Sequence, residues 1–342
     1  MILPLDQVDW LKAEGPEGEV VFSTRIRLAR NLANYTFPCL GNEEQLKGVV
    51  HDVGATIGER EGIFYNDSSK LSPLHLALLG ERHLVSPGFC NGTHPRALAL
   101  SEDGRLSLMV NEEDHLRIQL LTSGLQFRET WKLADALDRS LERHLRFAFD
   151  PQFGYLTSCI SNVGTGLRAS AMLHLPALAW FNAIDQIVAQ VSQVGLTVRG
   201  LYGEGTRPDG NLLQISNQIT LGPTEADILA KVDGIAKHLV QSELTARQQL
   251  LNQNRLQLED RVWRCLGLLK NARMMESNEA LAHLSMVRLG LDLGLLPNLP
   301  RTALKQLLVR IRPANLQFEA KRELAPLERD RMRAELLRKT LE

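Results

Sequence analysis

The first regular pattern along the chain is an alternation of apolar and polar residues in EVVFSTRIRLAR. Within it, Ile26 and Leu28 fall on one side of an extended backbone, and Arg25 and Arg27 fall on the other. A period of two residues is typical of a β-strand with one buried face. The stretch 19–30 therefore predicts a strand that carries two arginines on the same face.

Two more alternating stretches, RLSLMV and HLRIQL, stand on either side of the four residues NEED (111–114). Apolar residues recur at every second position in both, so each predicts a strand. A short polar break between two such strands predicts a turn that joins an antiparallel pair. We expect His115, Arg117 and Gln119 to share the strand face opposite the leucines.

Stretches with helical periodicity lie between these strands, and toward the C-terminus they are the only regular pattern. Residues 43–62 and 127–147 predict helices, and DQIVAQVSQVG predicts a helix that ends at Gly195. GYLTSC predicts a further strand, and LTVRGLYG and NLLQISNQITL predict a strand pair around a loop. From Pro223 onward, the pattern predicts helix after helix.

These elements predict an α+β fold, because the strands do not alternate strictly with helices. We expect an antiparallel sheet flanked by helices over residues 17–245. A small all-α domain should follow over residues 256–342, with the boundary between residues 245 and 256.

Composition narrows the classes of protein. The chain has 342 residues, of which 44% are hydrophobic and 23% charged, with a net charge of −1. This is ordinary for a globular protein and does not favour direct nucleic-acid binding. No signal peptide and no apolar run of membrane-spanning length stands out. The four scattered cysteines form no CxxC pair, so we expect a cytoplasmic protein with no disulfide framework and no protein metal site.

Arginines recur beside the predicted turns and glycine loops. Arginine forks bind phosphate oxygens through two parallel hydrogen bonds and stay charged, so several of them in one cleft would clamp a polyphosphate. Such a clamp also stabilises charge in phosphoryl transfer. The five candidates are Arg25, Arg27, Arg117, Arg168 and Arg199.

Two common nucleotide motifs offer alternatives. The chain has no GxxxxGK[ST], so it has no Walker A loop. GTGLRA (164–169) fits the dinucleotide fingerprint GxGxxG/A, and Asp185 follows at about the right distance. The regular βαβ units that this fingerprint requires are missing around it. A dinucleotide-binding oxidoreductase therefore stays a weaker hypothesis.

STRIRLAR, NEEDHLR, LTSCISNVGTGLRA and RGLYGEG, in this order, resemble the motifs of the phosphagen (guanidino) kinases over residues 20–222. Within that family, the chain is most similar to the bacterial protein-arginine kinases of the McsB type. It lacks the helical domain that precedes STR in metabolite kinases, and it has RGLYGEG where creatine kinases have RGTGG. RDRMRA (329–334) also fits their RDxxRA motif. The resemblance implies ATP and Mg²⁺ as cosubstrates.

The resemblance also implies roles for the acidic residues. The acceptor guanidinium is protonated under ordinary conditions, so it must be oriented and relieved of a proton before it can attack a phosphate. Glu113 matches the catalytic base, and Glu204 resembles a second carboxylate that contacts the guanidinium. Glu112 would support the magnesium shell or the turn, and Asp114 and His115 would hold the turn through hydrogen bonds.

Further positions follow from the same resemblance. The five arginines match the nucleotide-phosphate arginines of the family, and His83 resembles a histidine near the nucleotide. Cys159 matches the reactive cysteine, with Ser161 as a donor to its thiolate. Ile160 stands where the family usually has proline, so the resemblance does not fix the local loop geometry or the thiol pKa, although it still implies the reaction. The candidates for a phosphoarginine-binding, allosteric site are Arg329, Asp330 and Arg333.

The sequence thus predicts an ATP-dependent kinase that phosphorylates arginine side chains of proteins. By resemblance, such a kinase marks proteins for a Clp-type ATPase and protease, acts on a heat-shock repressor in the stress response, and works with a zinc-binding activator protein. A homodimer through the helical tail is also implied. The alternatives are a small-molecule guanidino kinase and a phosphoarginine-binding protein without catalysis.

Overall fold

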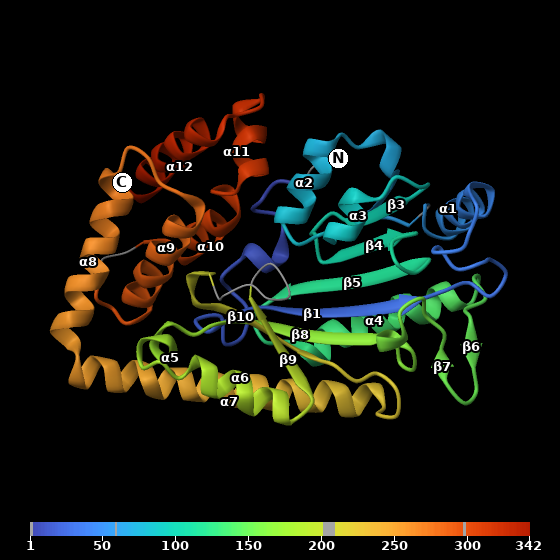
Figure 1. Cartoon of the computed structure of the whole chain (residues 1–342), viewed down its shortest axis with the longest axis horizontal. Helices are drawn as coiled ribbons and strands as arrows, with labels where there is room; N and C mark the ends of the chain where they lie inside the picture. The colour runs from blue at the N-terminus through green and yellow to red at the C-terminus, as the bar shows by residue number, and fades with distance from the viewer. Residues whose placement is uncertain (1–2, 59, 201–208, 297–298) are drawn as a thin grey trace.

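The computed structural model describes residues 3–58, 60–200, 209–296 and 299–342. Its centre is β1, Val21–Arg30, which pairs antiparallel with β5, Leu116–Ser123, and with β8, Leu167–His174. The described strands form an eight-stranded sheet in the order β2-β3-β4-β5-β1-β8-β10-β9, and every pair is antiparallel (Figure 1). The predicted antiparallel sheet is therefore confirmed.

The remaining strands complete the sheet and one small hairpin. They are β2 Ile63–Asp67, β3 Ala97–Ser101, β4 Leu106–Val110, β6 Phe149–Asp150, β7 Gly154–Tyr155, β9 Leu196–Gly200 and β10 Leu212–Asn217. Val110 stands opposite Leu116 across β4 and β5, so NEED is the turn of an antiparallel pair, as predicted. The strands β9 and β10 also pair as expected.

The prediction for GYLTSC was wrong beyond its first two residues. Only Gly154–Tyr155 is a strand, and Ile160–Asn162 is a 3₁₀ turn. The residues between bond locally and across the site, because the Thr157 hydroxyl donates to the Cys159 carbonyl and the Ser158 N–H donates to Asp114. Alternation cannot predict such bonds.

Two helices end earlier than predicted. The first, α1, is Glu43–Ile57 and stops at Gly58, so part of the predicted stretch 43–62 is free to lead into β2. The second, α4, is Phe127–Glu142, because the chain after it turns back into a β-bridge between Phe147 and Leu32. The N-terminus of α1 has a capping box in which Asn42 and Gln45 bond each other's backbone.

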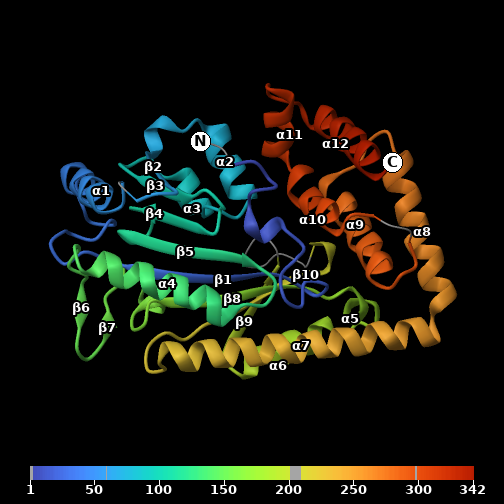
Figure 2. The same cartoon turned by 180° about the vertical axis from the view of Figure 1, so that it is seen from behind.

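Helices cover one face of the sheet. The helix α4 packs against β1 and β5, α7 (Glu225–Gln253) packs against β8 and β10, and α6 (Ile184–Gln193) packs against β9 (Figure 2). The inward residues Ile26, Leu28 and Ile118 are buried on this side. Three short helices lie elsewhere: α2 Pro73–Glu81, α3 Pro87–Asn91 and α5 Pro176–Trp180.

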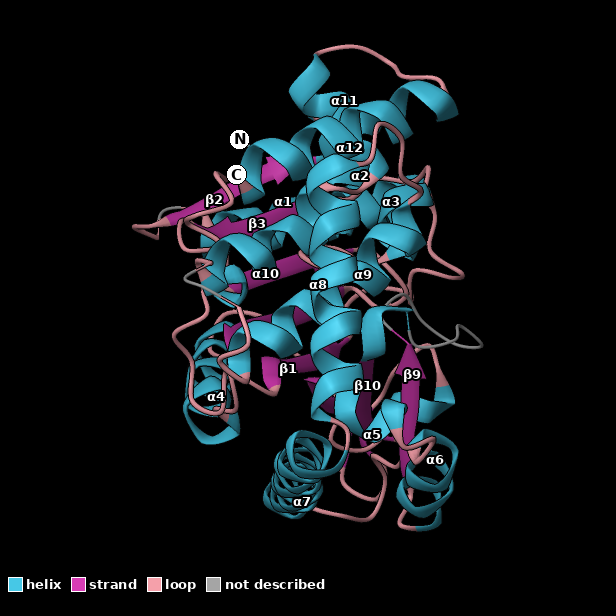
Figure 3. Ribbon diagram, turned by 90° about the vertical axis from the view of Figure 1, so that its left-hand side faces the viewer, coloured by secondary structure: helices cyan, strands magenta, loops and turns pink. Residues whose placement is uncertain are grey.

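The chain after α7 is helical, as predicted, and it lies at one end of the sheet (Figures 1 and 3). Its helices are α8 Arg255–Asn271, α9 Ser277–Asp292, α10 Arg301–Arg310, α11 Pro313–Ala320 and α12 Pro326–Leu341. No helix of the described part of the chain is long and apolar enough to cross a membrane.

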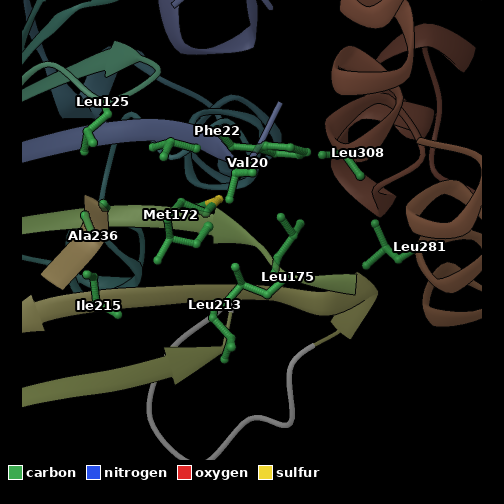
Figure 4. Close-up of a cluster of buried hydrophobic side chains, with 14 of the residues drawn as sticks. Val20, Phe22, Leu125, Met172, Leu175, Leu213, Ile215, Ala236, Leu281 and Leu308 are labelled. Carbon is green, nitrogen blue, oxygen red and sulfur yellow. The ribbon is translucent and has the colours of Figure 1, made fainter. Parts of the chain in front are cut away.

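The C-terminal helices share a hydrophobic core with the sheet. Leu281 of α9 and Leu308 of α10 belong to the same buried cluster as Phe22, Leu175 and Leu213 (Figure 4). Burying apolar surface at ~25 cal/mol per Å² makes such a junction hard to separate. The helical region is thus packed onto the sheet rather than joined to it by a linker alone.

A buried lysine crosses this junction. The Lys305 ammonium on α10 donates to the carbonyl oxygens of Lys12 and Phe22, each at 2.7 Å, and to the Ser123 hydroxyl at 3.1 Å. Burial lowers the pKa of Lys305 to about 7, and the charge of Arg288 adds to this effect.

We expect Lys305→Met to lower the free energy of unfolding by about 2 kcal/mol, because it removes the buried hydrogen bonds to Lys12, Phe22 and Ser123. The native pKa lies below the ordinary lysine value, so the unfolded chain binds more protons above about pH 7. Wild-type stability should therefore rise with pH between 7 and 9 relative to Lys305→Met. Denaturant titrations at several pH values measure both effects, and identical pH slopes would contradict the second.

Candidate functional site

The register of the sheet gathers arginines on the face away from α4 and α7. Arg27 on β1 stands directly opposite Gln119 on β5 and opposite Arg168 on β8. Ala29 stands opposite Arg117, and Arg199 on β9 stands opposite Gln214 on β10. Side chains of directly paired residues point to the same face. Strand pairing alone therefore brings distant arginines together.

Two neighbouring cavities lie over this face. The first has a volume of about 370 Å³ and the second about 250 Å³, and both are lined by Arg27, Arg117 and Arg199. The first is also lined by Glu112, Glu113, Asp114, Cys159, Ser161 and Arg168. The second is also lined by Arg25, His83, Ser86, Gln119 and Gln214. The structure therefore brings together all five predicted arginines, His83 and three of the predicted catalytic residues.

The arginines of this face lie close enough together to repel one another. Burial, together with like-charge repulsion from Arg117, Arg168 and Arg199, lowers the pKa of Arg25 to about 9. The pKa of Arg27 is lowered for the same reasons, and its Nε is buried without a hydrogen-bond partner among the described residues. An anion with several oxygens would relieve this repulsion, so the cluster fits the phosphates of a nucleotide.

His83 stands at the edge of the second cavity. Its backbone is left-handed, with φ of 58°, and its carbonyl oxygen accepts a hydrogen bond from Gln119. Its ring packs edge-on against Trp10. Burial lowers the pKa of His83 to about 3, and Arg25 and Arg312 add to this effect, so the ring is neutral at physiological pH.

Asp114 holds the NEED turn to two other segments. One of its oxygens accepts hydrogen bonds from the Asn31 side chain at 2.7 Å and from the Ser158 N–H at 2.6 Å. The Asn31 oxygen in turn accepts from the His115 N–H, and the His115 ring accepts from the Leu32 N–H. Asp114 and His115 thus hold the turn through hydrogen bonds, as predicted. His115 precedes β5 and lines neither cavity, whereas Arg117 and Gln119 both line the second one.

The two glutamates of the turn have different surroundings. Glu112 is nearly buried, and its oxygens accept from the Ser86 hydroxyl at 2.7 Å and from Arg117 at 2.8 Å. Burial alone would raise the pKa of Glu112, but Arg117 and Ser86 bring it below the ordinary value. Glu113 is exposed at the cavity. Partial burial, with the charges of Asp114 and Glu112, raises its pKa.

Cys159 lies beside Glu113. It lies close enough to Glu113 to lower the pKa of that carboxylate, against the larger effects that raise it, and its sulfur lies 3.1 Å from the Ser161 hydroxyl. Ile160 is 89% exposed at the first position of the 3₁₀ turn. Proline is compatible with the first position of a helical turn, because the N–H there has no partner within the turn. The turn can therefore be the same with either residue.

The glycine loop GTGLRA is not a dinucleotide site. It leads into the strand β8 rather than into a helix, whose N-terminus the dinucleotide fingerprint needs. A Cβ on Gly164 would lie 2.3 Å from the Thr220 carbonyl oxygen, and one on Gly166 would lie 2.6 Å from that of Ala29. These glycines let the loop pack against β1 and the chain after β10.

Two residues that support the site were missed from the sequence. Arg30, only 1% exposed, forms an ion pair with Asp138 at 2.7 Å and donates to the Thr165 carbonyl within the glycine loop. Asn31 connects Asp114 to the end of β1. The alternation in STRIRLAR places Arg30 on the same face as Ile26 and Leu28, so its position in the strand was the local signal of a buried arginine.

The remaining predicted residues lie apart from the cavities or outside the described residues. Glu204 falls within 201–208, which the structure does not describe. Arg329 and Asp330 are half-buried near the start of α12. Arg333 is buried and donates to the carbonyl oxygens of Ile311 and Met275 and to Asp330, so a phosphate would have to compete for these bonds.

Two family models together match nearly all of the chain after residue 44. Residues 45–246 match the ATP:guanido phosphotransferase C-terminal catalytic domain, and residues 255–342 match the C-terminal domain of the protein-arginine kinase McsB. A protein-arginine kinase of Brevibacillus brevis is 45% identical over 97% of this chain and 95% of its own length. The chain belongs to the protein-arginine kinases of the ATP:guanido phosphotransferase family.

Other comparisons agree with this family. A protein-arginine kinase of Symbiobacterium thermophilum is 47% identical over 97% of this chain and 96% of its own length. Lombricine kinase, with a TM-score of 0.60 and 22% identity, covers 74% of this chain and 72% of its own length. The duplicated taurocyamine kinase of Schistosoma mansoni has a TM-score of 0.61 and 24% identity. The match covers 72% of this chain and 36% of the taurocyamine kinase chain. These last two show the phosphagen kinase fold.

Kinases of this family use ATP with Mg²⁺, which are substrates rather than resident groups. Among the described residues, no group of three His, Cys, Asp or Glu side chains could hold a metal ion. Mg²⁺ is commonly bound through substrate phosphates, water and one or two carboxylates. Glu112, Glu113 and Asp114 are the carboxylates that line the first cavity, and one oxygen of Asp114 is already bonded to Asn31 and Ser158. The site therefore fits a metal that arrives with the nucleotide.

Arg27→Met should raise the free energy of unfolding of the ligand-free protein by about 1 kcal/mol, because it removes a repelled and partly unsatisfied charge. The same change should abolish the thermal stabilisation that Mg²⁺·ADP gives the wild type. Thermal and denaturant unfolding with and without nucleotide measure both. Arg128→Met, on the exposed side of α4, is the matched control. A less stable Arg27→Met protein would mean that the cluster supports the fold instead.

Proposed function

We propose that this chain transfers the γ-phosphate of ATP to arginine side chains of proteins. The observation that carries the proposal is the position of Glu113 and Cys159 beside a cavity lined by Arg27, Arg117, Arg168 and Arg199. One side of this site suits a guanidinium and the other suits a polyphosphate. A guanidino phosphotransferase needs both at once.

Each residue has a chemical task in this proposal. A guanidinium nitrogen forms a bond to the γ-phosphorus while the bond to the bridging oxygen breaks and ADP leaves. Glu113 accepts the proton that the guanidinium loses, and its raised pKa suits a general base better than that of an ordinary glutamate. Cys159 orients the guanidinium. The five arginines hold the phosphates and balance the charge that shifts to ADP.

The C-terminal region favours a protein acceptor over a small one. Residues 255–342 match a domain described for a protein-arginine kinase, and the relatives with that name are similar over almost their whole length. Lombricine and taurocyamine kinases resemble the chain at the level of the fold only. A small-molecule guanidino kinase and a non-catalytic phosphoarginine-binding protein are the outcomes that an assay must distinguish.

We also propose a division into a catalytic domain over residues 17–245 and a C-terminal domain over residues 256–342. The two matched families meet between residues 246 and 255, where α7 ends. Resemblance further supports allosteric phosphoarginine binding by Arg329, Asp330 and Arg333, although Arg333 has internal partners.

The cellular context is proposed from the same resemblance. It comprises a cytoplasmic homodimer that marks proteins for a Clp-type ATPase and protease, acts on a heat-shock repressor and responds to a zinc-binding activator protein. Glu204 as a second carboxylate rests on the sequence motif alone. Each partner can be tested by adding it to the transfer assay described next.

Labelled ATP with Mg²⁺ should place acid-labile phosphate on an arginine-rich protein such as casein and little on free arginine. Glu113→Gln should lower kcat about a hundredfold or more, because it removes the proton acceptor. Glu129→Gln, an exposed acid on α4, is the matched control and should have wild-type activity. Label on free arginine alone would indicate a metabolite kinase. No label, with or without an activator, would indicate a binding protein.

The pH dependence of kcat/KM should report on Glu113. Its pKa is raised and its carboxylate is the active form, so activity should fall on acidification at a higher pH than for an ordinary glutamate. Glu112→Gln removes a negative charge that repels the Glu113 carboxylate. The fall in kcat/KM at acidic pH should therefore occur at lower pH in this variant. The ionisations of ATP are common to both enzymes and cancel in the comparison. An acid limb that moves to higher pH would contradict this assignment.

A further inference from the structure

The segment between α2 and α3 reaches the NEED turn from far away in the sequence. The Ser86 hydroxyl donates to Oε1 of Glu112 at 2.7 Å, and Arg117 donates to Oε2 of the same carboxylate at 2.8 Å. Only 9% of the Glu112 side chain is exposed. A carboxylate buried to this degree is costly unless its oxygens are bonded, and these two donors provide the bonds.

Gly88 gives independent support for the same contact. It lies in α3, two residues after Ser86, and a Cβ on it would lie 2.7 Å from Oε1 of Glu112. Glycine is a poor helix former, so its presence in a short helix has no local reason. Its backbone leaves the space that the Glu112 carboxylate occupies.

We infer that Ser86 and Gly88 are positioning residues that set the Glu112 carboxylate and, through it, the Arg117 guanidinium of the nucleotide cavity. Ser86 lines the cavity that also contains His83 and Arg117, and Glu112 lines the neighbouring one. If Glu112 moves, Arg117 loses its partner at the place where both cavities meet. The inference rests on the proposed function for its rate measurements only.

Ser86 also caps a helix, and the experiment must distinguish this role from its hydrogen bond to Glu112. Its oxygen also accepts from the Phe89 N–H at 3.0 Å and so caps α3, with Pro87 at the first helical position. Ser72 caps α2 in the same way, accepts from the His75 N–H at 3.3 Å and also has a proline after it. Ser72→Ala therefore removes an equivalent cap without touching Glu112, and it is the matched control.

We expect Ser86→Ala to lower kcat/KM about tenfold, the usual effect of one hydrogen bond to a charged group. Ser86→Thr keeps the hydroxyl and should retain most of the activity, and Ser72→Ala should behave as wild type. Gly88→Ala should lower activity at least as much without loss of melting temperature, because alanine favours the helix. Gly267→Ala, in a helix with open space around it, is the control for Gly88.

The decisive measurement repeats both changes in a Glu112→Gln background. If Ser86 and Gly88 act through Glu112, neither should lower kcat/KM by more than about twofold there. The inference would be overturned if Ser86→Ala and Gly88→Ala lowered kcat/KM as much in the Glu112→Gln background as in the wild type. Wild-type activity of the single variant Ser86→Ala would also overturn it. Calorimetry can measure the affinity of the same variants for Mg²⁺·ADP without any phosphate acceptor. We expect this affinity to fall several-fold. If the protein phosphorylates only free arginine, or shows no transfer at all, the proposed function is refuted. The nucleotide-binding measurement still tests the role of Ser86 in either case.

Discussion

The site depends first on one buried carboxylate, that of Asp114. A single oxygen of it accepts from Asn31, at the end of β1, and from the N–H of Ser158, next to Cys159. It therefore fixes three segments at one point: the NEED turn, the central strand and the cysteine loop. Bonds to a charged acceptor are among the stronger hydrogen bonds in proteins, and two on one oxygen leave little freedom. Glu113 and Cys159 meet because Asp114 holds both of their segments.

The arginine cluster needs support against its own repulsion, and much of that support is remote. The carboxylate of Glu81, at the end of α2, accepts from the N–H groups of Ala314 and Asn315 at the start of α11. Two residues later, His83 lines the second of the two cavities over the arginine face. The C-terminal helices thus hold the segment that forms one wall of the cavity. These contacts hold the segment in place beside a group of arginines that repel one another.

Patterns of neighbouring residues predicted the strands and helices, but not the contacts between segments that lie far apart in the sequence. Alternation predicted β1 and the hairpin around NEED, because each strand has one buried face. It overextended the helix over 43–62, since the end at Gly58 depends on a strand that pairs with β3. It also could not identify Ser86, which contacts Glu112 across 26 residues of sequence. The motifs located Glu113 and the arginines, but the residues that hold them are joined by tertiary contacts that no short stretch records.

Glu112 and Glu113 show why the tertiary contacts matter more than residue type. They are adjacent and chemically identical, yet the pKa of one is lowered and that of the other is raised. Glu112 turns toward Arg117 and Ser86, so its charge is balanced and it is poorly suited to accept a proton. Glu113 turns toward the cavity, where Asp114 and Glu112 repel its charge. This difference supports the proposal that Glu113 accepts the proton while Glu112 holds Arg117 in place.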